Sequence, residues 1–129
     1  LQTRARVEQA QARVNQVRHQ QEGAQQLVRF EVEQAYRDVL VAQTNLASRD
    51  RDVTTTGEWL RTEQINFDLG FGDTENLIEA VRANLEAEAR YYEAVKAYNV
   101  AVLELMDATG TLASRARSGT LLDPSSSTN

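Results

Sequence analysis

Apolar residues recur along this chain with a helical period on both sides of one short break. The break is the segment DLGFGD at residues 68–73. Its two glycines permit a positive φ angle and a reversal of the chain. Asp73 and Thr74 are suited to cap a following helix that has Glu75 in its first turn. The pattern therefore predicts an all-α fold, a long antiparallel coiled-coil helical hairpin. Its expected parts are a helix over 1–69, a tip at 70–73, a second helix over 74–110 and a C-terminal tail over 111–129.

The first predicted helix carries a strict seven-residue repeat, which predicts a left-handed supercoil against a partner helix. The repeat consists of Val32, Val39, Leu46, Val53, Leu60 and Phe67. An upstream series on another heptad position consists of Val7, Val14 and Val28. The step of four from Val28 to Val32 is a stutter, which predicts local unwinding at about 23–32. The segment TTTG at 54–57 has low helix propensity, so it is either a tolerated irregularity within the helix or a bend.

The second predicted helix has alanine at one heptad position five times in succession, which lets a neighbouring helix approach closely. These alanines, the alanine seam, are Ala80, Ala87, Ala94, Ala101 and Ala108. Further apolar rows run beside this seam, so that apolar residues cover more than one face of the helix; one of these rows consists of Ile78, Leu85, Tyr92 and Met106. A helix packed on one partner needs one apolar stripe, so this pattern favours contact with two neighbours. A plain antiparallel bundle core is the alternative. Gly110 is expected to end the helix as a C-cap, and the DPSSSTN tail has the composition of a disordered terminus.

Composition and charge narrow the classes of function. The chain has 129 residues, a net charge of −5 and no cysteine. Nucleic-acid binding needs a basic patch, so we expect no nucleic-acid partner. The absence of cysteine excludes disulfides and cysteine-ligated metals within the chain. No apolar run approaches the ~18 residues of a membrane-spanning helix.

Candidate catalytic chemistry is sparse. His19 is the only histidine and lies in a polar, glutamine-rich stretch, where a solvated surface position is expected. The GFG sequence at 70–72 lacks the strand and the third glycine of a phosphate-binding loop. Three acids of the second helix, Glu86, Glu88 and Glu93, can be imagined around a carboxylate-bridged metal, but no Glu-x-x-His pair accompanies them. We therefore predict a non-enzyme with no catalytic residue, no metal and no cofactor.

Acidic residues gather around the break. On an isolated hairpin, Asp68, Asp73, Glu75 and Glu79 are ordinary capping and surface groups. In a ring of hairpins, those that face inward would form an acidic constriction that favours cations. The candidates for such a constriction are Asp73, Glu75 and Glu79.

Several segments together resemble one known family. They are EVEQAYRD at 31–38, LGFGDT at 69–74, LIEA at 77–80, and AVKAYNVA at 94–101 with the closing ATG at 108–110. Their order and spacing over residues 4–110 are similar to the C-terminal repeat of the TolC-like outer membrane efflux protein (outer membrane factor) family.

The resemblance implies a homotrimeric channel in which helical hairpins build a periplasmic α-barrel tunnel below an outer-membrane β-barrel. It implies transport in tripartite efflux or type I secretion, with localisation to the periplasmic portion of the outer membrane of a Gram-negative envelope. The implied partners are a periplasmic adaptor (membrane fusion) protein and an inner-membrane transporter. The implied docking element is the tip, formed by Leu69, Gly70, Phe71 and Gly72.

The chain departs from the family pattern in having one hairpin, no barrel strands and no signal peptide, as expected of the final part of such a protein. The membrane contact would be made by regions outside it. The second glycine and Asp73 are expected to make the tip more acidic and more flexible than is typical. A structural coiled-coil or adaptor bundle without a transport role is the alternative, and a carboxylate metalloenzyme bundle ranks third. We expect the isolated chain to be marginally stable or oligomeric.

Overall fold

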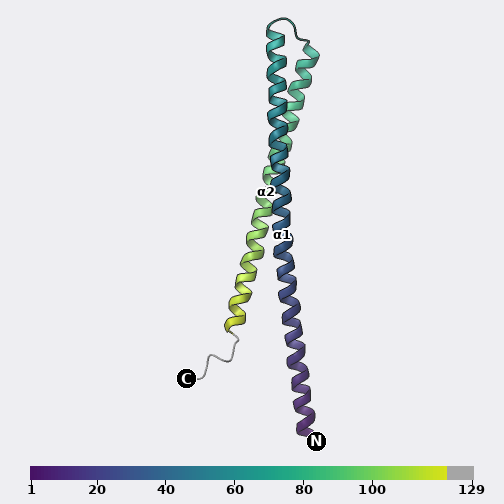
Figure 1. Cartoon of the computed structure of the whole chain (residues 1–129), viewed down its shortest axis with the longest axis vertical. Helices are drawn as coiled ribbons and strands as arrows, with labels where there is room; N and C mark the ends of the chain where they lie inside the picture. Colours follow the sequence, from purple (N-terminus) through teal and green to yellow (C-terminus); the bar gives the residue numbers. More distant parts are fainter. Residues whose placement is uncertain (122–129) are drawn as a thin grey trace. The chain divides into compact units, whose positions relative to one another are not determined.

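The computed structural model describes residues 1–121, with the side chains at 112, 115 and 118–121 excepted. Two helices make up almost all of this range: α1 spans Gln2–Asp68 and α2 spans Thr74–Leu121. No strand occurs among the described residues. The predicted all-α fold of two long helices joined by a short tip is therefore confirmed for this part of the chain (Figure 1).

The second helix is longer than the sequence pattern suggested. It continues through Gly110 to Leu121, so the prediction that it ends at residue 110 is wrong. Gly110 does not adopt a positive φ angle. On either side of it, the hydroxyls of Thr109 and Thr111 donate to the helical carbonyl oxygens of Met106 and Asp107, both at 3.0 Å. A helical glycine costs only about 1 kcal/mol relative to alanine, and the alanines and arginines that follow favour the helix. The tail predicted to be disordered, 123–129, lies outside the described residues.

The chain divides into two compact units, which are described separately. The tip unit comprises Tyr36–Leu105 and contains the reversal between α1 and α2. The terminal unit comprises Leu1–Ala35 and Met106–Asn129, described as far as Leu121.

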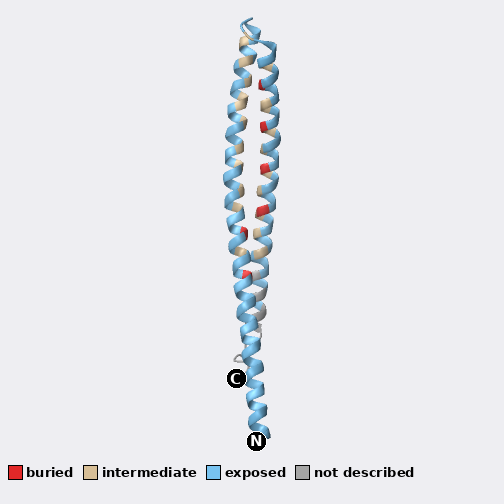
Figure 2. Ribbon diagram, turned by 90° about the vertical axis from the view of Figure 1, so that its right-hand side faces the viewer, coloured by how far each residue is buried: buried red, intermediate tan, exposed pale blue. Residues whose placement is uncertain are grey.

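The core of the tip unit is a thin seam between its two antiparallel helices (Figure 1). On α2 the seam consists of small residues: Ala80, with none of its surface exposed, and the buried alanines Ala87, Ala94 and Ala101. On α1 the half-buried residues of the heptad repeat face them, namely Val39, Leu46, Val53 and Leu60. The buried positions of α2 lie on the side turned toward α1 (Figure 2). Small residues on one helix and branched residues on the other allow close packing with little core volume.

A polar contact between the two helices interrupts this seam. The Thr56 hydroxyl lies 3.2 Å from Oδ1 of Asn84, on the opposite helix, and 2.8 Å from the carbonyl oxygen of Asp52. The Asn84 amide nitrogen donates to Glu88 at 3.4 Å. α1 remains α-helical through the low-propensity segment at 54–57.

The last member of the α1 repeat, Phe67, does not join the seam. Its side chain is exposed, and Asn66 is half-buried instead. Because Thr56 is level with Asn84, Phe67 is level with Asp73, which precedes the first residue of α2. No helix therefore stands opposite Phe67 to cover it.

In the terminal unit, the buried residues of α1 lie at the stutter and just after it. Val28 is 2% exposed and Ala35 is also buried, whereas every residue from 1 to 27 is exposed. α1 stays α-helical throughout 23–32. Ala108, the last member of the alanine seam, is half-buried in this unit.

Candidate functional site: the hairpin tip

The end of α1 adopts a Schellman motif, which reverses the chain in a defined geometry. Gly70 takes the left-handed conformation, with φ at 79°. Its N–H donates to the carbonyl oxygen of Phe67 at 3.1 Å, and the Phe71 N–H donates to that of Asn66 at 2.9 Å. These are the two hydrogen bonds that define the motif. Gly70 is required because a side chain disfavours this backbone conformation.

Gly72 is required for a different reason, the close approach of two backbone segments. A Cβ atom at this position would lie 2.6 Å from the Phe67 nitrogen and 2.9 Å from the Phe67 Cα. The Gly72 N–H donates to the carbonyl oxygen of Asn66 at 2.9 Å, so this carbonyl accepts from both Phe71 and Gly72. The sequence predicted a reversal at the two glycines, but it did not separate these two roles.

The beginning of α2 is capped by Asp73. Oδ1 of Asp73 accepts a hydrogen bond from the Glu75 N–H at 3.2 Å, and the Asp73 carbonyl oxygen accepts from the Leu77 N–H at 3.2 Å. This is the geometry of an N-cap residue, and Glu75 adds a favourable negative charge in the first turn. The N–H groups from Leu69 to Gly72 all donate to backbone carbonyls. The tip is thus held by hydrogen bonds on both sides.

This fixed backbone presents apolar side chains outward. Phe71 is 86% exposed, and Leu69 is exposed as well. Neither side chain belongs to the seam. Exposed Asp68 and Asp73 flank the two residues in the sequence. The tip therefore combines an aromatic and an aliphatic side chain with neighbouring carboxylates.

The candidate constriction residues differ in what their carboxylates do. All three are exposed. Asp73 caps α2, whereas Glu79 makes no hydrogen bond or ion pair within the described part of the chain. Glu79, Glu86 and Glu93 share one heptad position and form an acidic row on α2. Among the described residues, no three acidic or histidine side chains gather closely enough to hold a metal ion.

The second apolar row of α2 stays uncovered in the tip unit. We call its members in this unit, Ile78, Leu85 and Tyr92, the outer row. Leu85 is 60% and Tyr92 is 69% exposed. Each lies two residues before a buried alanine, which places it about 160° around the helix from the alanine seam. The acidic row lies about 100° around the helix from it, because each glutamate directly follows a member of the outer row.

One feature of this unit was not predicted, the Thr56–Asn84 contact between the helices. The signal available in the sequence was an asparagine within an otherwise apolar or aromatic heptad row that includes Leu77, Tyr91 and Tyr98. A single polar residue at a seam position commonly fixes the register of paired helices.

Comparisons of the chain with protein-family models, with curated proteins and with solved structures find no match. The resemblance to the outer membrane efflux family therefore stays a prediction. Neither described helix combines the length and the apolar content that crossing a membrane requires.

Proposed function

We propose that this chain is a periplasmic tunnel segment of an outer-membrane channel for tripartite efflux or type I secretion. One observation carries the proposal. After α1 has covered the alanine seam, α2 still presents the outer row to solvent. A helix in a closed ring of helices needs contacts on more than one side, and a hairpin that functions alone does not.

The size of these side chains supports a further helix–helix contact. Fully burying a side chain of this size contributes about 1.5–3 kcal/mol. Leu85 and Tyr92 have more than half of their surface still available for burial. Neighbouring hairpins in a homotrimer would cover this row and would give the pair of helices the support that its thin seam lacks.

The tip supports the proposal through its fixed geometry. Docking of Phe71 and Leu69 onto a periplasmic adaptor would require little ordering of the backbone, because hydrogen bonds already hold it. Preorganisation of this kind lowers the entropic cost of association. The inner-membrane transporter of the system would then be reached through the adaptor.

The acids of α2 have a role in this assembly. Glu79 is the strongest of the constriction candidates, because Asp73 is engaged as a helix cap and Glu75 lies in the first turn. A ring of such carboxylates at the periplasmic entrance would favour the passage of cations.

The proposal is tested by determining which compartment the tip faces in the protein encoded by the whole gene. The chain itself contains no cysteine, so Phe71→Cys introduces a unique reactive group in this segment. We expect it to react with a membrane-impermeant maleimide when the outer membrane is permeabilised and the inner membrane is intact. Ala80→Cys, at a fully buried position, is the matched control and should remain unlabelled.

The alternative function gives the opposite result. A cytoplasmic structural coiled coil would expose Phe71→Cys to the reagent only after lysis of the inner membrane. Labelling that requires lysis rejects the channel proposal.

A further inference from the structure

A second exposed apolar stripe occupies the N-terminal part of α1. We call Val7, Ala10, Val14 and Val17 the N-terminal stripe. Steps of three and four residues separate its members, and the same steps continue through Gln21 and Ala24 to Val28. This is the spacing of the contact positions of a coiled coil.

The N-terminal stripe continues an interface that is already formed. Val28 is 2% exposed within the terminal unit, whereas Val14, two heptads earlier, is 57% exposed. The same face of α1 is thus covered at Val28 and uncovered at the N-terminal stripe. An uncovered contact face that continues a covered one is suited to bind another helix.

The residues beside the stripe are basic or neutral. In a coiled coil, the positions that flank the contact positions determine which partner is accepted. The flanking residues are Arg6, Arg13 and Gln20 on one side, and Arg4, Gln11 and Arg18 on the other. The acids of this segment, Glu8 and Glu22, lie at neither flank.

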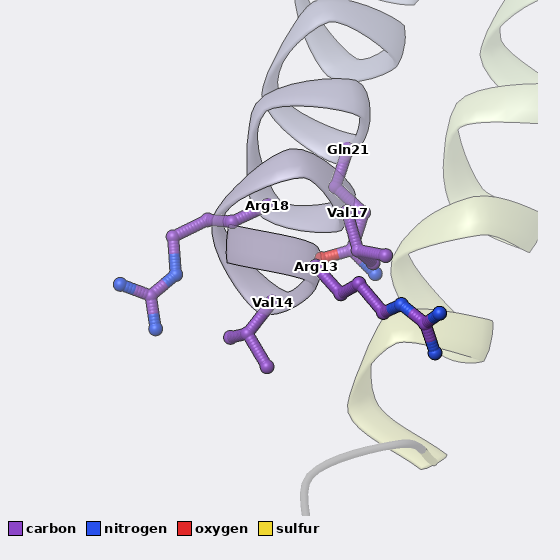
Figure 3. A pocket seen from close by; sticks show the side chains of 5 residues that line it. All are labelled: Arg13, Val14, Val17, Arg18 and Gln21. Atoms are coloured by element: carbon purple, nitrogen blue, oxygen red, sulfur yellow. The ribbon is translucent and has the colours of Figure 1, made fainter. Parts of the chain in front are cut away.

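The close-up view agrees with this arrangement. Arg13, Val14, Val17, Arg18 and Gln21 line an open groove on α1. The guanidinium groups of Arg13 and Arg18 extend to opposite sides of Val14 (Figure 3). Neither arginine forms an ion pair with a carboxylate in the part of the chain that the structure describes. Both are therefore available to a partner.

We infer that the N-terminal stripe binds an amphipathic helix that has aliphatic contact residues and glutamate or aspartate at its flanking positions. Pairing of two N-terminal stripes from two copies would bring arginine against arginine, which disfavours a second copy as the occupant. Residues 122–129 contain one acid and no apolar repeat, so they do not supply this helix. Carboxylates on the partner would instead form charge-assisted hydrogen bonds with the arginines.

The inference does not depend on the proposed function, since a channel and a structural coiled coil both permit such a partner. Its test uses the full chain and a synthetic three-heptad peptide with isoleucine and alanine at the contact positions and glutamate at the flanks. The control peptide has lysine in place of each glutamate. We expect fluorescence anisotropy to show binding of the glutamate peptide alone, with weaker binding as ionic strength rises.

Variants of the chain distinguish the effect of the arginines beside the stripe from the effect of the overall charge of the chain. Arg6→Glu with Arg13→Glu should weaken binding of the glutamate peptide by tenfold or more and permit binding of the lysine peptide. The matched control, Arg61→Glu with Arg82→Glu, changes two exposed arginines outside the stripe and should leave the affinity unchanged. The inference is overturned if the glutamate peptide does not bind, if both peptides bind equally, or if the two double variants lose affinity equally.

A third pair of variants tests the apolar part of the surface. Val14→Asp should abolish binding, whereas Val41→Asp, at an exposed valine outside the stripe, should not. Equal effects of these two substitutions would also contradict the inference. Circular dichroism of each variant establishes that the chain remains helical.

Discussion

Replacement of glycine by alanine is predicted to destabilise the chain at the tip and to stabilise it within α1. Gly72→Ala would place a Cβ atom 2.6 Å from the Phe67 nitrogen, 2.9 Å from its Cα and 3.0 Å from the carbonyl carbon of Asn66. All three are backbone atoms at the end of α1, so no side-chain rotation relieves the clash. Residues 66–72 must shift, and the bonds from Phe71 and Gly72 to the Asn66 carbonyl weaken.

The expected loss in free energy of unfolding follows from the steric clash and from the weakened hydrogen bonds. Steric overpacking costs about 1–3 kcal/mol, and each weakened hydrogen bond costs up to about 1 kcal/mol. We therefore expect Gly72→Ala to lower the free energy of unfolding by about 2–4 kcal/mol. Gly70→Ala should cost about 1–2 kcal/mol, because alanine is disfavoured at φ 79° although no atom lies within 4 Å of its Cβ.

Gly23→Ala is the control of opposite sign. Gly23 is helical with a negative φ angle, and nothing lies within 4 Å of the added Cβ. Alanine should raise stability by about 0.5–1 kcal/mol, because it is the better helix former. Guanidinium unfolding of the variants, followed by circular dichroism at one protein concentration, measures all three values. Unfolding of Gly72→Ala at the same denaturant concentration as the parent chain would refute the close backbone contact at the tip.

Three other substitutions test the seam and the cap by the same unfolding measurement. Ala94→Leu should destabilise the chain by about 1–3 kcal/mol through overpacking of the buried seam, whereas Ala97→Leu, on the exposed side of α2, should have little effect; equal effects would contradict the placement of the seam. Asp73→Ala should cost about 0.5–2 kcal/mol through loss of the N-cap, and Asp73→Asn should retain most of the stability. Thr56→Val should cost about 0.5–1.5 kcal/mol through loss of the contact with Asn84, and Thr54→Val, whose hydroxyl bonds only to its own helix, should cost less.

The sequence predicted the features that depend on local periodicity. The heptad repeats identified both helices, and the alanine repeat matches the residues that the tip unit buries. Glycine and aspartate located the reversal and the cap, because their preferences are short-range properties of the backbone.

The sequence did not predict features of two kinds. In one, the preference of a single residue competes with that of its neighbours; in the other, the feature depends on the three-dimensional course of the chain. Gly110 had the signal of a helix end, but its helical neighbours outweighed the cost of one glycine. Phe67 continued the heptad repeat, but the position of the turn removed any helix opposite it. The contact of Gly72 with Phe67 arises only from the three-dimensional course of the Schellman motif.

The sequence likewise predicted part of the candidate site. The sequence placed Leu69 and Phe71 at the tip and the acids beside them. It could not give their exposure, because that depends on how the turn directs each side chain. The assignment of Asp73 to the cap and the freedom of Glu79 likewise required the hydrogen bonds of the structure.

The central claim is that the outer row of α2 requires neighbouring helices. Sedimentation equilibrium of the chain over a range of protein concentrations tests this claim most directly. We predict that the parent chain self-associates and that Leu85→Ser with Tyr92→Ser, at two exposed positions of the outer row, shifts it toward the monomer. A parent chain that stays monomeric at every concentration and melts in one sharp cooperative transition would contradict the account.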